Sequence, residues 1–175
     1  MASLDEQFQQ ACSARDIPGV VLLASDSTGK FNYEKAFGLK SPSENIDVNS
    51  TFIMASCTKL ITSISALQCV KRGQIKLDDD VSTVLVEFRD IQILTGFEEG
   101  TEEPTFKTAE NKITLRQLLT HSSGIGYPIT SSLLSRWYKS LGDQVGTTGD
   151  PIIKRITVPL LFEPGTSWKY GYGLD

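Results

Sequence analysis

A serine and a lysine one helical turn apart open a long apolar run, and this feature constrains the chain most. Ser56 and Lys59 are followed by a stretch, 60–70, in which apolar residues recur with helical spacing. A basic pair and then Gly73 form a typical helix end. If the helix begins near Ser56, the two side chains share one face and lie within reach of each other. The sequence therefore predicts a buried helix that presents Ser56 and Lys59 in its first turn.

This pairing has a catalytic interpretation. A serine hydroxyl is a poor nucleophile at neutral pH and needs an adjacent base. Lys59 can act as that base only if it is partly neutral, and both burial and the positive helix N-terminus lower the pKa of a lysine. Backbone N–H groups near Ser56 can also stabilise an oxyanion. The alternative is an N-capping serine followed by a solvated lysine.

Length and charge exclude several classes of protein. A chain of 175 residues can form one domain with a sizeable core or two small lobes. The net charge of −4 and the lack of a basic stripe give no support for nucleic-acid binding. No apolar stretch approaches the roughly 20 residues of a membrane span, and the N-terminus does not resemble a signal peptide. We therefore expect a cytoplasmic protein that binds neither nucleic acid nor membrane.

The cysteines and the single histidine narrow the chemistry further. Three unpatterned cysteines indicate reduced thiols rather than disulfides, and with His121 they make a poor zinc site. A Ser-His-Asp triad would have to use His121. This residue ends a short helix that Thr114 and Gln117 begin with a capping box, which favours a structural role over a catalytic one. The acidic turn 78–80 indicates a helix start or a solvated loop, so we expect no metal.

The remaining pattern gives a coarse outline. We expect an amphipathic helix over 4–15, with a strand over 20–24 whose continuous apolar character predicts burial on both faces. A second strand follows over 31–37 after a turn. The segment 60–162 is mostly helical in pattern, with polar loops expected at 95–111 and 142–150.

Five ordered segments resemble the serine β-lactamase-like superfamily. This superfamily includes class C β-lactamases, penicillin-binding peptidases, related esterases and the fungal transesterases typified by lovastatin acyltransferase. The segment 55–59 looks like its nucleophile motif, and 113–124 is similar to its "ITLRHLLTHTSG" motif. The other three are 17–20, which looks like the opening strand, 73–79 ("G-x-x-x-L-D-D") and 164–170 ("PG-x-x-W-x-Y").

The resemblance implies an α+β fold of the β-lactamase/transpeptidase type. Residues 1–55 would form the N-terminal helix and two strands of a partial antiparallel sheet lobe, and residues 56–175 a mainly helical lobe with both motifs. It also implies that Ser56 is the acylated nucleophile and that Lys59 and Tyr170 share general-base and general-acid duty. Cys57 would be a packed neighbour. The implied reaction moves an acyl group from a small ester or thioester to an alcohol or water without a cofactor, with an acyl-carrier domain as a possible donor.

Two departures from the family pattern refine this expectation. Tyr172 stands where penicillin-recognising members have asparagine, which points away from β-lactam hydrolysis and makes Tyr172 a candidate substrate-binding residue of a transesterase. The chain also stops at Asp175, five residues after Tyr170. We therefore expect an amino-terminal portion, truncated before the C-terminal strands, that needs a complementary C-terminal segment. The alternatives are a non-catalytic remnant acting as a binding module and a penicillin-binding protein or β-lactam hydrolase.

Overall fold

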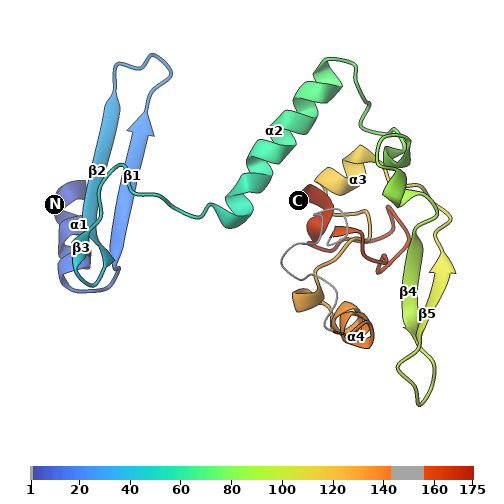
Figure 1. The fold of residues 1–175 in the computed structure, drawn as a ribbon. Coiled ribbons are helices and arrows are strands. Elements are labelled where there is room, and N and C mark those ends of the chain that lie inside the picture. The colour runs from blue at the N-terminus through green and yellow to red at the C-terminus, as the bar shows by residue number, and fades with distance from the viewer. Residues whose placement is uncertain (1, 143–155) are drawn as a thin grey trace. The chain divides into compact units, whose positions relative to one another are not determined.

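The chain forms two compact units in the computed structural model, Met1–Met54 and Ala55–Asp175 (Figure 1). The structure describes residues 2–142 and 156–175. Residues 143–150 of the loop predicted at 142–150 lie outside that range.

The first unit is one helix and a three-stranded antiparallel sheet. Helix α1 (Leu4–Ser13) begins with a capping box between Ser3 and Glu6. Strands β1 (Gly19–Ser25) and β2 (Asn32–Ser41) pair antiparallel, and the short β3 (Glu44–Asn45) pairs with β2. The predicted helix and both predicted strands are confirmed, because their signals (capping, alternation and a glycine turn) are local.

Helix α1 packs on the hairpin through a few side chains. Phe8 stacks on Phe37 with ring centroids 6.2 Å apart, and the Tyr33 hydroxyl donates a 2.5 Å hydrogen bond to Asp5. No residue from 2 to 54 is buried, and Leu23 of β1 is 66% exposed. The expected burial of β1 on both faces is wrong for this chain, because no element among the described residues of the unit covers the second face.

The second unit is mainly helical. A 3-10 turn, η1 (Ala55–Cys57), leads into α2 (Thr58–Lys71), and Gly73 ends this segment with a φ of +71°. The short helices α3 (Leu115–Leu119) and α4 (Ser132–Ser140) follow. The described part of the unit also contains the 3-10 turns η2 (Val81–Thr83), η3 (Val86–Phe88), η4 (Pro128–Thr130) and η5 (Tyr172–Leu174).

A β-hairpin occupies much of the segment that the sequence predicted as a polar loop. Strands β4 (Gln92–Phe97) and β5 (Pro104–Thr108) pair antiparallel, so the loop expected at 95–111 is wrong. Ile93 and Leu94 are buried, whereas Thr95 and Thr105 bond to each other at 2.9 Å on the exposed side. One face of an antiparallel hairpin can stay polar, and this solvent-facing half hid the strands in the sequence.

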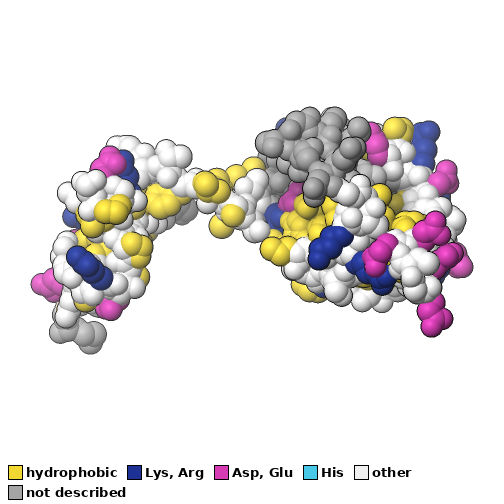
Figure 2. All heavy atoms as spheres, turned by 60° about the horizontal axis from the view of Figure 1, so that its bottom comes forward, with side chains coloured by type: hydrophobic (Ala, Val, Ile, Leu, Met, Phe, Trp, Pro, Cys, Tyr) yellow, Lys and Arg dark blue, Asp and Glu magenta, His cyan; other side chains and the backbone are white. Residues whose placement is uncertain are grey.

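The hydrophobic core lies entirely beyond residue 80. Its buried members are Val81, Phe88, Ile93, Leu94, Ile113, Leu118, Ile125, Leu134, Val158 and Leu160. Helix α2 has no buried residue, and Leu60, Ile61, Ile64 and Leu67 are all exposed. Figure 2 shows hydrophobic side chains on the visible surface of both units. The prediction of α2 as a helix is confirmed, but its expected burial is not found in this chain.

Candidate active site

The backbone is strained immediately before Ser56. Ala55 has a φ of +45°, in the left-handed region that residues with a Cβ rarely occupy. Ser56 follows in the 3-10 turn η1 and is exposed, one residue before the α-helical segment that contains Lys59. Strained backbone of this kind is concentrated at functional sites, so the conformation at Ala55 marks this turn as a candidate site.

The segment that carries Tyr170 is fixed to the core side of the unit. The Glu163 carboxylate accepts hydrogen bonds of 2.7 Å from the amides of Glu110 and Asn111. Lys169 donates its N–H to the carbonyl of His121 at 2.9 Å. The segment is therefore held on both sides of the turn that precedes Tyr170, by the Glu163 side chain before the turn and by the Lys169 backbone after it.

A close backbone approach follows Tyr170. A side chain at Gly171 would meet the carbonyl oxygen of Ile125 at 2.2 Å, so this position requires glycine. The contact brings Tyr170 and Tyr172 alongside Tyr127, whose ring centroid lies 5.6 Å from that of Tyr170 and 4.4 Å from that of Tyr172. Tyr172, the predicted substrate-binding residue, thus belongs to a cluster of three tyrosines.

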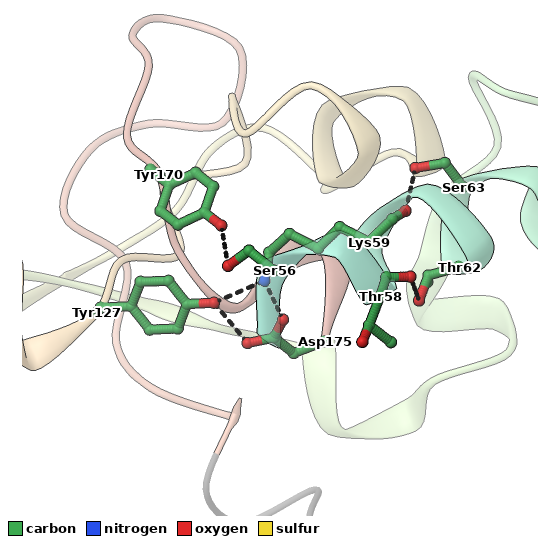
Figure 3. Close-up of polar contacts among 8 residues, drawn as sticks. All are labelled: Ser56, Thr58, Lys59, Thr62, Ser63, Tyr127, Tyr170 and Asp175. Carbon is green, nitrogen blue, oxygen red and sulfur yellow. Dashed lines mark hydrogen bonds and ion pairs between the residues drawn. The ribbon is translucent and has the colours of Figure 1, made fainter. Parts of the chain in front are cut away.

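The structure brings Ser56 and Tyr170 together (Figure 3). Their hydroxyl oxygens are 2.7 Å apart in a hydrogen bond. Among the described residues, no hydrogen bond joins Ser56 to Lys59. The Lys59 ammonium instead lies 5.3 Å from the ring centroid of Tyr170, within the range of a cation–π contact. The three predicted catalytic residues therefore share one site, in which Tyr170 contacts both Ser56 and Lys59.

Two residues that the sequence did not single out hold Lys59. The ammonium donates to the Tyr127 hydroxyl at 2.9 Å and forms an ion pair with the Asp175 carboxylate. Tyr127 in turn donates to the other Asp175 oxygen at 2.6 Å, which closes a triangle of polar contacts (Figure 3). The lysine side chain is only 13% exposed. This enclosure fixes both the position and the charge of Lys59.

The pKa of Lys59 is shifted in the direction opposite to the expectation. Burial by itself lowers its pKa, but the hydrogen bonds to Asp175 and Tyr127 outweigh burial and raise the pKa above its ordinary value. The predicted lowering is therefore wrong: the anionic partner was not visible in the sequence. Burial and Asp175 likewise raise the pKa of Tyr127 against the opposing effect of Lys59. Lys59 is an ammonium at neutral pH in this arrangement.

Sequence and structure comparisons place the chain among known proteins. Residues 4–172 match the family described as Beta-lactamase. The chain belongs to this family. It is 38% identical over 98% of its length to the lovastatin esterase of Penicillium rubens, and 35% identical over 98% to the monacolin J acid methylbutanoyltransferase of Aspergillus terreus. It is also 32% identical over 99% to esterase EstB of Burkholderia gladioli.

Solved structures agree with the family assignment. A simvastatin synthase variant from Aspergillus terreus matches 98% of the chain with a TM-score of 0.83 and 34% identity. The chain spans only 42% of that protein, and 43% to 44% of the three curated relatives. The β-lactamase/transpeptidase-like fold expected from the sequence motifs is therefore confirmed for the part of the family fold that this chain spans.

The residues missed at the site gave weak sequence signals. Tyr127 comes three residues after Gly124, which ends the family motif, and Asp175 is an isolated acid after Tyr172. Neither differs in sequence from an ordinary surface tyrosine or aspartate. Their importance arises only from the docking of the segment 170–175 against 125–127, which places both beside Lys59.

The described residues offer no metal centre. Within 2–142 and 156–175, no group of three or more His, Cys, Asp or Glu side chains lies close enough to hold an ion. In the acidic turn, Asp78 pairs with Arg116 at 2.7 Å, and Asp80 caps η2 by accepting from the Ser82 amide at 2.9 Å. Of the two predicted interpretations, a helix start and a solvated loop, the structure shows the helix start. None of the described helices has the length and apolar character required to cross a bilayer.

Proposed function

We propose that this chain carries the nucleophile part of a serine acyltransferase or esterase site, with Ser56 as the acylated residue. The 2.7 Å contact between the hydroxyls of Ser56 and Tyr170 is the observation that carries the proposal. Relatives named as an esterase and as acyltransferases support a small ester or thioester as the acyl donor. The acceptor is a small alcohol or water, and no step requires a cofactor.

The proton path follows from the charge of Lys59. Because the Lys59 ammonium already holds a proton, the base of the proposed path is Tyr170 in its phenolate form, which takes the proton of Ser56 and becomes a neutral phenol as the serine oxygen attacks the acyl carbon. The acyl–oxygen or acyl–sulfur bond then breaks, and Tyr170 returns the proton to the leaving group. Lys59, beside the Tyr170 ring, stabilises the phenolate that is present before Tyr170 takes the proton and again after it has returned it.

The start of the η1–α2 segment supplies a place for the developing oxyanion. The first amides of a helix lack intrahelical acceptors and lie at the positive end of its dipole. Ser56 occupies this position in the chain. An acyl carbonyl bonded to Ser56 can point its oxygen at these amides, which is the arrangement that stabilises tetrahedral intermediates in acyl transfer.

The exposed apolar surface of helix α2 is evidence for a further partner segment. It is apolar on several sides, yet none of its residues is buried, and a helix of that kind belongs in the interior of a protein. The chain spans less than half of its curated relatives. We infer a complementary C-terminal segment that covers α2 and completes the site. An acyl-carrier domain as the donor and a cytoplasmic location remain predictions from the sequence.

A non-catalytic binding module is the second candidate. The ion pair between Lys59 and Asp175 favours it, because an ammonium with a fixed counter-ion is removed from the role of base that the sequence assigned to it. A covalent serine probe separates the two candidates, since only an assembled catalytic site activates Ser56.

The decisive experiment is intact-mass analysis after treatment with a fluorophosphonate. The chain is tested alone and with the C-terminal portion of the Penicillium lovastatin esterase supplied as a separate chain. With the C-terminal portion present, we expect one adduct in wild type and in Cys57→Ala, and none in Ser56→Ala. Lys59→Ala should lose most labelling, because the Tyr170 phenolate then lacks the positive charge that stabilises it. An adduct that survives in Ser56→Ala and vanishes in Cys57→Ala would contradict the assignment of Ser56.

Substrate class is tested with matched acyl donors. We expect Ser56 to be acylated faster by p-nitrophenyl esters of short acids than by penicillins, because Tyr172 supplies no amide for a β-lactam side chain. The variant Tyr172→Asn is the matched control and should reduce the difference between the rates of acylation by esters and by penicillins. Penicillin acylation that exceeds ester acylation in the wild type would favour the β-lactam alternative.

A further inference from the structure

His121 lies against Tyr170 in a conformation that few residues adopt. Its φ is +58°, in the left-handed region, where histidine is tolerated better than most residues with a side chain. Its ring centroid lies 4.6 Å from that of Tyr170, and Trp168 meets it edge-on at 6.2 Å. Its carbonyl accepts the N–H of Lys169, the residue before Tyr170. Both the backbone and the ring of His121 therefore constrain the predicted catalytic tyrosine.

The imidazole has a polar atom that packing alone does not explain. Its Nδ1 is buried and has no hydrogen-bond partner among the described residues. An unpaired buried polar atom is costly, of order 1–3 kcal/mol, so an apolar ring would fill the same space at a lower cost. A purely structural role thus accounts for the ring but not for the choice of histidine.

The groups that face His121 keep it neutral. Burial lowers the pKa of His121, the positive charge of Lys59 on α2 lowers it further, and Asp175 after η5 opposes both. Tyr170 is the remaining titratable group packed on the ring. Protonation would put a second cation beside Lys59 that competes for the same carboxylate, and it would place that charge against the phenol of Tyr170.

We propose that His121 is a positioning residue for Tyr170, whose phenol it holds against Ser56 only while the imidazole is neutral. The inference rests on the proposed function, because Tyr170 matters for the reaction only if Ser56 is acylated. It assigns to His121 an effect on the reaction that acts through another residue, with no contact to the substrate.

The first test uses the wild-type chain and needs no activity. His121 and the tyrosines are labelled with ¹³C in their rings, the Tyr170 signal is identified with Tyr170→Phe, and pH is varied. We expect His121 to titrate below its ordinary value of 6.5 and the Tyr170 signal to shift with the same midpoint. A Tyr170 signal that ignores the titration of His121 would overturn the inference.

Two substitutions separate the ring from the charge. His121→Phe keeps an aromatic ring without a titratable group, and His121→Asn tolerates the left-handed backbone while removing the ring. We expect Ser56 labelling by fluorophosphonate to slow roughly 10- to 100-fold in His121→Asn. In His121→Phe the labelling rate at neutral pH should stay close to that of the wild type. In the wild type the rate should fall at acidic pH as His121 is protonated, and in His121→Phe this fall should shift or disappear.

Failure of this inference is distinguishable from failure of the proposed function. If Ser56 is labelled but both variants react at the wild-type rate with the wild-type pH profile, His121 does not position Tyr170. If Ser56 is not labelled even with the C-terminal portion supplied, the proposed function is wrong, and the titration of the Tyr170 signal still decides whether His121 constrains that residue.

Discussion

Residues 2–80 and the described residues from 81 to 175 differ in one decisive respect. The second region buries a continuous set of apolar side chains, whereas no residue of the first region is buried. Both regions carry comparable apolar sequence: β1 is as hydrophobic as β4, and α2 is more apolar than α4. The difference teaches that an apolar pattern specifies a helix or a strand but does not supply the layer that covers it.

The candidate site is assembled from both of these regions. Ser56 and Lys59 come from the region without a core, and Tyr127, Tyr170 and Asp175 come from the region that has one. Polar contacts join the two sides, with distances of 2.7 Å from Ser56 to Tyr170 and 2.9 Å from Lys59 to Tyr127. The tyrosine half of the site therefore belongs to the region with a buried core, and the nucleophile half depends on whatever covers α2.

The largest expected effect comes from supplying that cover. We expect the isolated chain to hydrolyse p-nitrophenyl esters near the background rate. Adding the C-terminal portion of the lovastatin esterase, in cis or in trans, should raise the rate by at least about 10²- to 10³-fold, the typical effect of one oxyanion donor. The same mixture with Ser56→Ala is the control. Robust Ser56-dependent turnover by a monomer of the chain alone would show that α2 needs no cover.

The contrast between the two regions should also appear in unfolding. Leu134 is fully buried, so Leu134→Ala should lower the free energy of unfolding by about 2–5 kcal/mol. Leu60 is 67% exposed, so Leu60→Ala should change it by no more than about 0.5 kcal/mol. Urea denaturation followed by circular dichroism measures both. Equal losses in the two variants would mean that α2 is covered in solution, for example by a second copy.

A smaller effect is expected at the ion pair. Asp175→Asn should lower the free energy of unfolding by about 1–2 kcal/mol, because a mostly enclosed ammonium loses its charged partner. The exposed pair of Asp78 and Arg116 is the matched control, and Asp78→Asn should cost less, because both of its charged groups are exposed to solvent. Urea denaturation at neutral pH compares the two variants.

The pH dependence of the ion pair has a definite sign. The folded-state pKa of Lys59 is raised above its ordinary 10.5, so the contribution of Lys59 is fully present below pH 10.5 and is lost only as pH rises beyond that value. In Asp175→Asn the ¹³Cε signal of Lys59 should titrate at a lower pH than in the wild type. An unchanged titration would show that Asp175 does not hold Lys59 in solution.

Local signals predicted much of the fold. The capping box of Thr114 and Gln117, the end of α2 near Gly73 and the pairing of β1 with β2 all follow from residues that are close in sequence. The hairpin of β4 and β5 escaped prediction because its outer face is polar, and burial of its inner face depends on Leu160, which bridges to Ile93 from 67 residues away (160 − 93).

The site was predictable as a set of motifs but not as an arrangement. Ser56, Lys59 and Tyr170 were each expected from segments of the sequence, and the fold places all three together. The protonation of Lys59 was predicted in the wrong direction, because a pKa depends on which charges lie nearby in space. Asp175 is 116 positions from Lys59, and no periodicity in the sequence connects the two.

The sequence by itself determined α1, the pairing of β1 with β2, α2, the family motifs and the identity of the candidate nucleophile, since helix spacing, caps and turn residues act over a few positions along the chain. Tertiary structure alone decided which tyrosine meets Ser56, which residues enclose Lys59 and which apolar faces are covered. The physical reason is the distance along the chain over which each interaction acts. Backbone preferences are set by neighbours in sequence, whereas burial and the protonation of side chains are set by neighbours in space.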